Sequence, residues 1–151
     1  MNFDLLLVDS KDKKKIKMKK AIIVGASSGI GKEIALSLLR DHYKIGITGR
    51  RINNLEEIKK IDPQNIFVSS FDCTKESNAK KLDALAKLMG GLDMLVISSG
   101  FGDVNKSLKF SIENKTNQLN VVAFTETVGW GFNYFSKQNS GHIVAISSIA
   151  G

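Results

Sequence analysis

The sequence has 151 residues, 42% of them hydrophobic and 25% charged, which indicates one soluble globular domain with a core of its own. The formal net charge of +7 does not indicate a nucleic-acid partner, because residues 1–20 alone carry +4 and the lysine run at 11–20 has no aromatic residue for base stacking. A single cysteine excludes an internal disulfide and fits a reducing cytoplasm, two histidines are too few for a zinc cluster, and no apolar run is long enough to span a membrane.

Residues 1–17 are expected to be a disordered basic leader, or an upstream extension with no role in the fold. Met18-Lys19-Lys20 immediately precedes the first predicted strand, and Met18 stands where a compact domain would begin. The apolar part of the leader is only four residues long and is flanked by Asp4 and Asp9, which is not the pattern of a secretory signal. The fold prediction therefore concerns residues 18–151.

Strand-like and helix-like segments alternate from residue 21 onward. Short apolar runs predict five strands, at 21–25, 44–48, 65–71, 92–98 and 142–147. Apolar residues at helical spacing predict helices between them, at 30–39, 52–61, 82–89 and about 112–137. This alternation requires parallel strands joined by crossovers, so the predicted fold class is α/β, a doubly wound parallel sheet of the Rossmann type. The chain stops at Gly151, where a further helix is due, and the sheet is therefore expected to be incomplete at its C-terminal end.

The segment G-A-S-S-G-I-G at 25–31 joins the first predicted strand to the first helix. Its spacing does not match a P-loop, because Ile30 stands where the second glycine is required and Glu33 follows Lys32. It also departs from G-x-G-x-x-G and leaves the pattern G-x-x-x-G-x-G. A glycine turn at a helix N-terminus lets a pyrophosphate approach the backbone, so a dinucleotide site is predicted here. The predicted binding residues are Gly25, Ala26, Ser27, Ser28, Gly29, Ile30 and Gly31.

The end of the second predicted strand reads T-G-R-R at 48–51, and no acidic residue occurs there before Glu56. A carboxylate at this position would hold the 2′-hydroxyl of NAD, whereas guanidinium groups suit a 2′-phosphate. Arg50 and Arg51 therefore predict NADP as the cofactor, with NAD less favoured. The alternative interpretation is that Arg50 and Arg51 are solvated surface residues without a role in binding.

With these motifs in place, the sequence resembles the short-chain dehydrogenase/reductase family, in particular its single-domain branch. Further matching segments are F-D-C-T at 71–74, L-V-I-S-S-G at 95–100 and G-H-I-V-A-I-S-S-I-A-G at 141–151, so the resemblance covers 19–151. It implies that Asp72 and Cys73 contact the adenine ring. It also implies that Ser98, Ser99 and Gly100 lie under the adenosine side of the cofactor. Serines stand there in place of the family's asparagine and alanine, and Val24 in place of its threonine, which predicts weaker side-chain organisation and not loss of binding.

The resemblance further implies hydride transfer between a nicotinamide and a small carbonyl or alcohol substrate. Ser148 matches the family's catalytic serine, which polarises or positions the carbonyl, and Asn120 matches the asparagine that holds a kinked helix and a water of the proton relay. The family's Tyr-x-x-x-Lys pair, which supplies the proton, would follow after Gly151. Tyr134 and Lys137 are one residue too close together and precede the serine strand, so they are expected to be structural or surface residues.

Three interpretations of function stay open. The first is an NADP-dependent oxidoreductase of which the chain is a part. The second is a dinucleotide-binding module or pseudoenzyme without the tyrosine and lysine, and the third is a nonfunctional remnant. The long predicted helix is apolar around much of its circumference and needs a partner surface, which favours the first. In the family that surface comes from the next helix and a second subunit, so a homodimer or homotetramer is expected.

Overall fold

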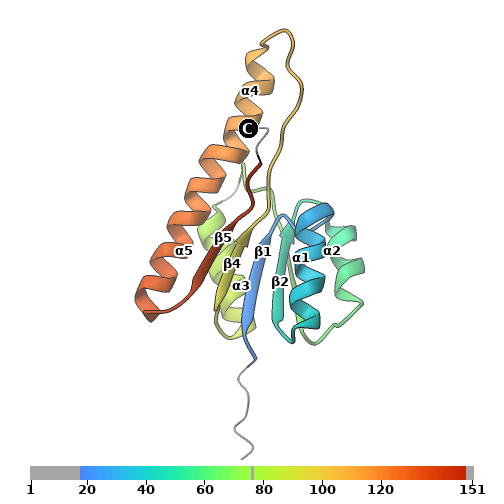
Figure 1. Ribbon diagram of the computed structural model, residues 1–151, viewed down its shortest axis with the longest axis vertical. Coiled ribbons are helices and arrows are strands. Elements are labelled where there is room, and N and C mark those ends of the chain that lie inside the picture. The colour runs from blue at the N-terminus through green and yellow to red at the C-terminus, as the bar shows by residue number, and fades with distance from the viewer. Residues whose placement is uncertain (1–17, 76, 149–151) are drawn as a thin grey trace, which may run out of the picture.

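The computed structural model describes residues 18–75 and 77–148 (Figure 1). The leader predicted at 1–17 lies outside the described residues. Five parallel strands in the described part form one sheet in the order β3-β2-β1-β4-β5. They are β1 (Lys20–Val24), β2 (Lys44–Gly49), β3 (Ile66–Ser70), β4 (Met94–Ile97) and β5 (His142–Ala145). The predicted α/β class and doubly wound parallel sheet are confirmed.

The central strand β1 is paired on both sides. Ala21 stands opposite Ile45 of β2 and Met94 of β4. The side chains of Ala21, Ile22 and Ile23 are fully buried, because a parallel sheet with helices on both faces leaves no face for water. This explains why the strand reads as a continuous apolar run and not as an alternating one.

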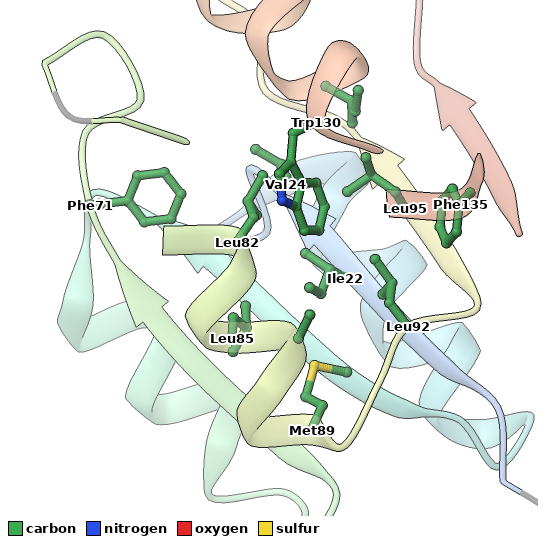
Figure 2. Close-up of a cluster of buried hydrophobic side chains, with 12 residues drawn as sticks. Ile22, Val24, Phe71, Leu82, Leu85, Met89, Leu92, Leu95, Trp130 and Phe135 are labelled. Atoms are coloured by element: carbon green, nitrogen blue, oxygen red, sulfur yellow. The ribbon is translucent and has the colours of Figure 1, made fainter. Parts of the chain in front are cut away.

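Two pairs of helices cover the two faces of the sheet (Figure 1). On one face lie α1 (Gly29–Arg40) and α2 (Ile52–Lys59), and on the other lie α3 (Asn78–Met89) and α5 (Phe124–Gln138). Figure 2 shows the core under the second pair, where Leu82 of α3 lies near Trp130 of α5, and Phe135 of α5 lies beside Leu95 of β4. A separate cluster fills the space under α1 and α2.

The single helix predicted at about 112–137 is three segments. These are α4 (Phe110–Asn117), a π-helical turn η1 (Gln118–Ala123) and α5. Figure 1 shows α4 and α5 as one long rod that extends beyond the end of the sheet. Apolar spacing did not reveal the break, because a π-turn adds about one residue and the apolar pattern continues through it.

Several predicted boundaries and faces differ from the structure. Ile30 is 62% exposed and belongs to the cleft described below, and Ile61 lies beyond the end of α2 and is 58% exposed. The last strand ends at Ala145, two residues before the predicted end at Ser147, so Ser147 and Ser148 both follow the sheet. None of the helices in the described ranges is long and apolar enough to cross a membrane.

Candidate dinucleotide site

The strand order places a topological switch point between β1 and β4, and the loops that follow these two strands meet at the carboxyl edge of the sheet. A cleft of about 950 Å³ opens at this edge. It is lined by the glycine loop, the end of β2, the loop after β4, part of η1 and the residues after β5. Thirteen of the sixteen residues predicted for the site line the cleft. The three that do not are Ala26, Gly29 and Asp72.

The glycine loop is held by the neighbouring strands. The backbone N–H groups of Gly25 and Ala26 donate to the carbonyl of Thr48 at 3.1 and 2.8 Å, which ties the loop to β2. A Cβ on Gly25 would lie 2.6 Å from the backbone nitrogen of Ser99, and a Cβ on Gly31 would lie 2.2 Å from the carbonyl oxygen of Gly25. These two glycines are therefore required by close backbone packing, which brings the loop after β1 against the loop after β4.

The N-terminus of α1 lies at the cleft and can receive an anion. Ser28 is the N-cap in an extended conformation, yet its side chain makes no capping hydrogen bond within the described residues. Its Oγ accepts from the guanidinium of Arg51 instead. The first N–H groups of a helix have no partner inside the helix and carry the positive end of its dipole. Ser28, Ile30 and Gly31 line the cleft at this end.

Arg51 connects the start of α2 to the glycine loop. Its Nε and Nη2 donate to Ser27 Oγ at 3.2 and 3.0 Å. Asn54, one turn further along α2, donates from Nδ2 to the Ser27 carbonyl at 3.1 Å. Asn54 was not predicted as a site residue, because no motif marks it and only its place on the helix brings it to the loop. Arg50 also lines the cleft, whereas the contacts to the two serines are made by Arg51.

Asp72 and Cys73 follow β3 and differ in their placement. Cys73 lines the cleft, whereas Asp72 stands outside its lining and its Oδ1 accepts from the N–H and hydroxyl of Thr74 at 3.0 and 2.7 Å. Burial raises the pKa of Asp72, but the Thr74 hydrogen bonds and the positive charges of Arg50 and Lys75 outweigh it and leave the pKa below 3.8. Burial and then the charge of Asp72 raise the pKa of the Cys73 thiol above 9.0. The carboxylate is therefore ionised and the thiol neutral at physiological pH.

Asn120 lies in the π-helical turn and binds the loop after β4. Its Oδ1 accepts from the N–H of Phe101 at 2.9 Å and its Nδ2 donates to the Phe101 carbonyl at 2.7 Å. The ammonium of Lys115 stands 4.3 Å from the centre of the Phe101 ring. Phe101 directly follows Ser98, Ser99 and Gly100, and it was not identified from sequence because the family motif stops at the glycine.

Ser148 lines the same cleft as Asn120, which brings the two residues predicted to be catalytic to one site. Tyr134 and Lys137 lie elsewhere, in a groove between α3 and α5 together with Asp83 and Trp130. The Tyr134 ring packs against that of Trp130 with centroids 5.3 Å apart. Burial and the charges of Asp83 and Asp93 raise the pKa of Tyr134 above 10.0. Nothing in this placement gives the pair access to the cleft.

The sheet, the glycine loop at the switch point and the cleft beside it define an α/β domain of the Rossmann type. The sequence profile of the short chain dehydrogenase family matches residues 19–151, and the chain belongs to that family. An uncharacterised oxidoreductase of Listeria monocytogenes is 36% identical over 144 residues, which cover 90% of this chain and 57% of that protein. An uncharacterised oxidoreductase of Staphylococcus epidermidis is 32% identical over 140 residues, which cover 91% of this chain and 61% of that protein.

Solved structures agree with this membership. ElxO with NADP bound superposes with a TM-score of 0.79 at 28% identity, over 87% of this chain and 56% of that one. The glucose dehydrogenase of Caenorhabditis elegans in its apo form superposes with a TM-score of 0.73 at 30% identity, over 87% of this chain and 55% of that one. The chain thus spans a little more than half the length of each of these four proteins.

Proposed function

We propose that this chain is the cofactor-binding part of an NADP-dependent oxidoreductase that transfers hydride between the nicotinamide and a small carbonyl or alcohol substrate. The observation that carries the cofactor choice is the position of Arg51, which follows the end of β2 and whose guanidinium bonds to Ser27 and Ser28 of the glycine loop. In this fold the adenosine ribose lies at the end of β2, so the guanidinium stands where a 2′-phosphate would need a cation. The bound NADP in the structure of ElxO supports the same choice.

The residues present fit the other parts of the cofactor. The N-terminus of α1 and the glycine loop suit the pyrophosphate, and Cys73, which also lines the cleft, suits a contact to the adenine. Because Gly25 has no side chain, the backbone of Ser98 and Ser99 packs closely against the glycine loop, and Ser98, Ser99 and Gly100 line the cleft beside it. We assign the nicotinamide end to the part of the cleft that holds Asn120 and Ser148.

The cofactor supplies the hydride chemistry when it is bound. In the proposed mechanism, Ser148 donates a hydrogen bond to the substrate oxygen and polarises the carbonyl, while Asn120 holds the loop after β4 in place through Phe101. The proposal requires a proton donor from outside this chain, and a Tyr-x-x-x-Lys motif after residue 151 would supply it. The apolar residues exposed on η1 and α5, Val121 (55%) and Phe132 (65%), are assigned to contacts with that part and with a second subunit.

Titration of the protein with NADPH and with NADH, followed by nicotinamide fluorescence, tests the cofactor assignment. The proposal predicts tighter binding of NADPH, and equal affinities would contradict it. The reading frame after codon 151 tests the reaction: a Y-x-x-x-K motif supports the oxidoreductase, whereas its absence would leave the dinucleotide-binding module or pseudoenzyme as the better interpretation.

A further inference from the structure

Asn78 is a buried polar residue outside the cleft. It is the first residue of α3, and only 1% of its surface is exposed. Its Nδ2 donates to the backbone carbonyl of Ala123 at 3.2 Å, across 45 residues of sequence. Its Oδ1 is buried and has no hydrogen-bond partner among the described residues. An orphaned buried carbonyl oxygen opposes folding, so general stability gives little reason for an asparagine here.

The carbonyl that Asn78 binds belongs to the last residue of the π-helical turn. The same Ala123 oxygen accepts a second side-chain hydrogen bond from Thr127 Oγ1 at 2.7 Å, and Thr127 is only 2% exposed. Two buried donors, one on α3 and one on α5, therefore converge on the junction of η1 with α5. A π-turn is less favourable than an α-turn, and it persists where its surroundings stabilise it.

The π-turn decides where Asn120 points. One residue occupies about 100° of an α-helix, so a helix without the extra residue would present position 120 about 100° away around its axis. The rotation of α5 itself is fixed by Trp130 and Phe135, which are buried in the core. If the turn relaxed to α-helix, Asn120 would thus swing away from Phe101 and both hydrogen bonds to the loop after β4 would be lost.

We propose that Asn78 is a positioning residue for the dinucleotide site: with Thr127 it holds the Ala123 carbonyl, maintains the π-turn, and so keeps Asn120 on the Phe101 loop. Its link to cofactor binding rests on the proposed function. Its effect on the loop does not, because that effect needs only the contacts described above.

Hydrogen exchange of single backbone amides tests the proposal. The variant Asn78→Leu removes the donor and also the orphaned oxygen, so it changes global stability little. The Phe101 amide, which donates to Asn120, is expected to exchange about three- to ten-fold faster than in the wild type, the effect of losing one hydrogen bond. The Ser98 amide, which donates to the carbonyl of Val24 in the sheet, serves as the internal reference and is expected to keep its rate.

Further variants separate positioning from stability. Thr127→Val should accelerate exchange at Phe101 as Asn78→Leu does, whereas Thr127→Ser, which keeps the hydroxyl, should preserve the wild-type rate. Ile58→Val weakens the core on the other face of the sheet. It should leave the ratio of the exchange rates of the Phe101 and Ser98 amides unchanged. Equal acceleration at Phe101 and Ser98 in Asn78→Leu, or no acceleration at Phe101, would overturn the proposal.

NADPH titration of the same variants tests the link to the cofactor. The link is supported if Asn78→Leu and Thr127→Val bind NADPH more weakly than the wild type while Ile58→Val does not. It is overturned if Asn78→Leu and Thr127→Val both bind NADPH as the wild type does. If the wild-type protein itself binds no NADPH, the proposed function fails, while the exchange rates still decide whether Asn78 positions Asn120.

Discussion

The side chain of Asn120 satisfies both backbone hydrogen-bonding groups of Phe101, accepting from its N–H at 2.9 Å and donating to its carbonyl at 2.7 Å. A primary amide can do this because it carries one acceptor and one donor at adjacent positions. The contact joins the π-helical turn to the loop that follows β4, across 19 residues of sequence. It makes the position of that loop depend on the helix.

Replacement of Asn120 by alanine is expected to loosen the loop and to lower the free energy of unfolding by about 1 kcal/mol, since the two lost bonds lie at an exposed site. Chymotrypsin cleaves after phenylalanine, so limited proteolysis should cut the variant faster after Phe101. Asn117→Ala, an exposed asparagine at the end of α4, is the matched control and should be cut at the wild-type rate. Equal cleavage of the two variants would show that the Asn120 contact does not hold the loop.

The two glycines at the start of α1 are expected to respond differently to alanine. A Cβ on Gly31 would meet the Gly25 carbonyl at 2.2 Å, whereas a Cβ on Gly29 has no neighbour within 4 Å and meets only the strain of a φ of +58°. Gly31→Ala should therefore lower the free energy of unfolding by about 3 kcal/mol or more, and Gly29→Ala by about 1 kcal/mol. Urea unfolding of both variants measures the difference. Equal losses would mean that the loop adapts to a side chain at position 31.

Cys73 gives a prediction on pH. The pKa of the Cys73 thiol is raised above 9.0 in the folded protein. As the pH rises past 9, the unfolded chain therefore loses the thiol proton before the folded protein does. The contribution of the Cys73 thiol to the free energy of unfolding is fully present below pH 9 and is lost as the pH rises through the pKa of the folded state. Urea unfolding at pH 7 and pH 10 should thus show a smaller loss for Cys73→Ala than for the wild type. An identical loss would place the thiol in a more polar setting than the cleft wall provides.

The same residue is expected to react slowly with iodoacetamide at pH 8, because the thiolate is the reactive species. The rate in the folded protein should be well below that in the urea-unfolded protein. If the cofactor covers Cys73 as proposed, saturating NADPH should slow the reaction further, and an unchanged rate would argue against that contact.

Much of the fold could be predicted from sequence because the signals are local. Both faces of β1 are buried, so an uninterrupted apolar run identifies it, and the glycine loop is marked by backbone packing that only glycine allows. The family resemblance implied a kinked helix at Asn120, but apolar spacing did not show the π-turn, because the apolar pattern continues through it and its contact with Asn78 is distant in sequence. Phe101 and Asn54 were missed for a similar reason: the hydrogen bonds of Phe101 are made by its backbone, and those of Asn54 depend on where α2 sits.

The same difference, between local signals and contacts of residues distant in sequence, explains where the predicted site residues lie. Those that belong to strand ends and to the glycine loop reach the cleft, since the sheet topology brings these segments together. Asp72 does not line it, because its carboxylate turns to Thr74 in the loop after β3. The roles of Ser148 and Asn120 in catalysis remain predictions from the family resemblance, although both residues lie at the cleft.

The most direct test of the central claim is the ratio of NADH to NADPH dissociation constants in the wild type, Arg51→Ala and Arg40→Ala. Arg51 also braces the glycine loop, but loss of that support weakens both cofactors and cancels in the ratio. Arg40, exposed at the end of α1, controls for the loss of one positive charge. We predict a wild-type ratio above one that falls about ten-fold in Arg51→Ala, the effect of losing a charge-assisted contact, and is unchanged in Arg40→Ala. A ratio near one in the wild type, or the same ratio in wild type and Arg51→Ala, would contradict the assignment of NADP to this site.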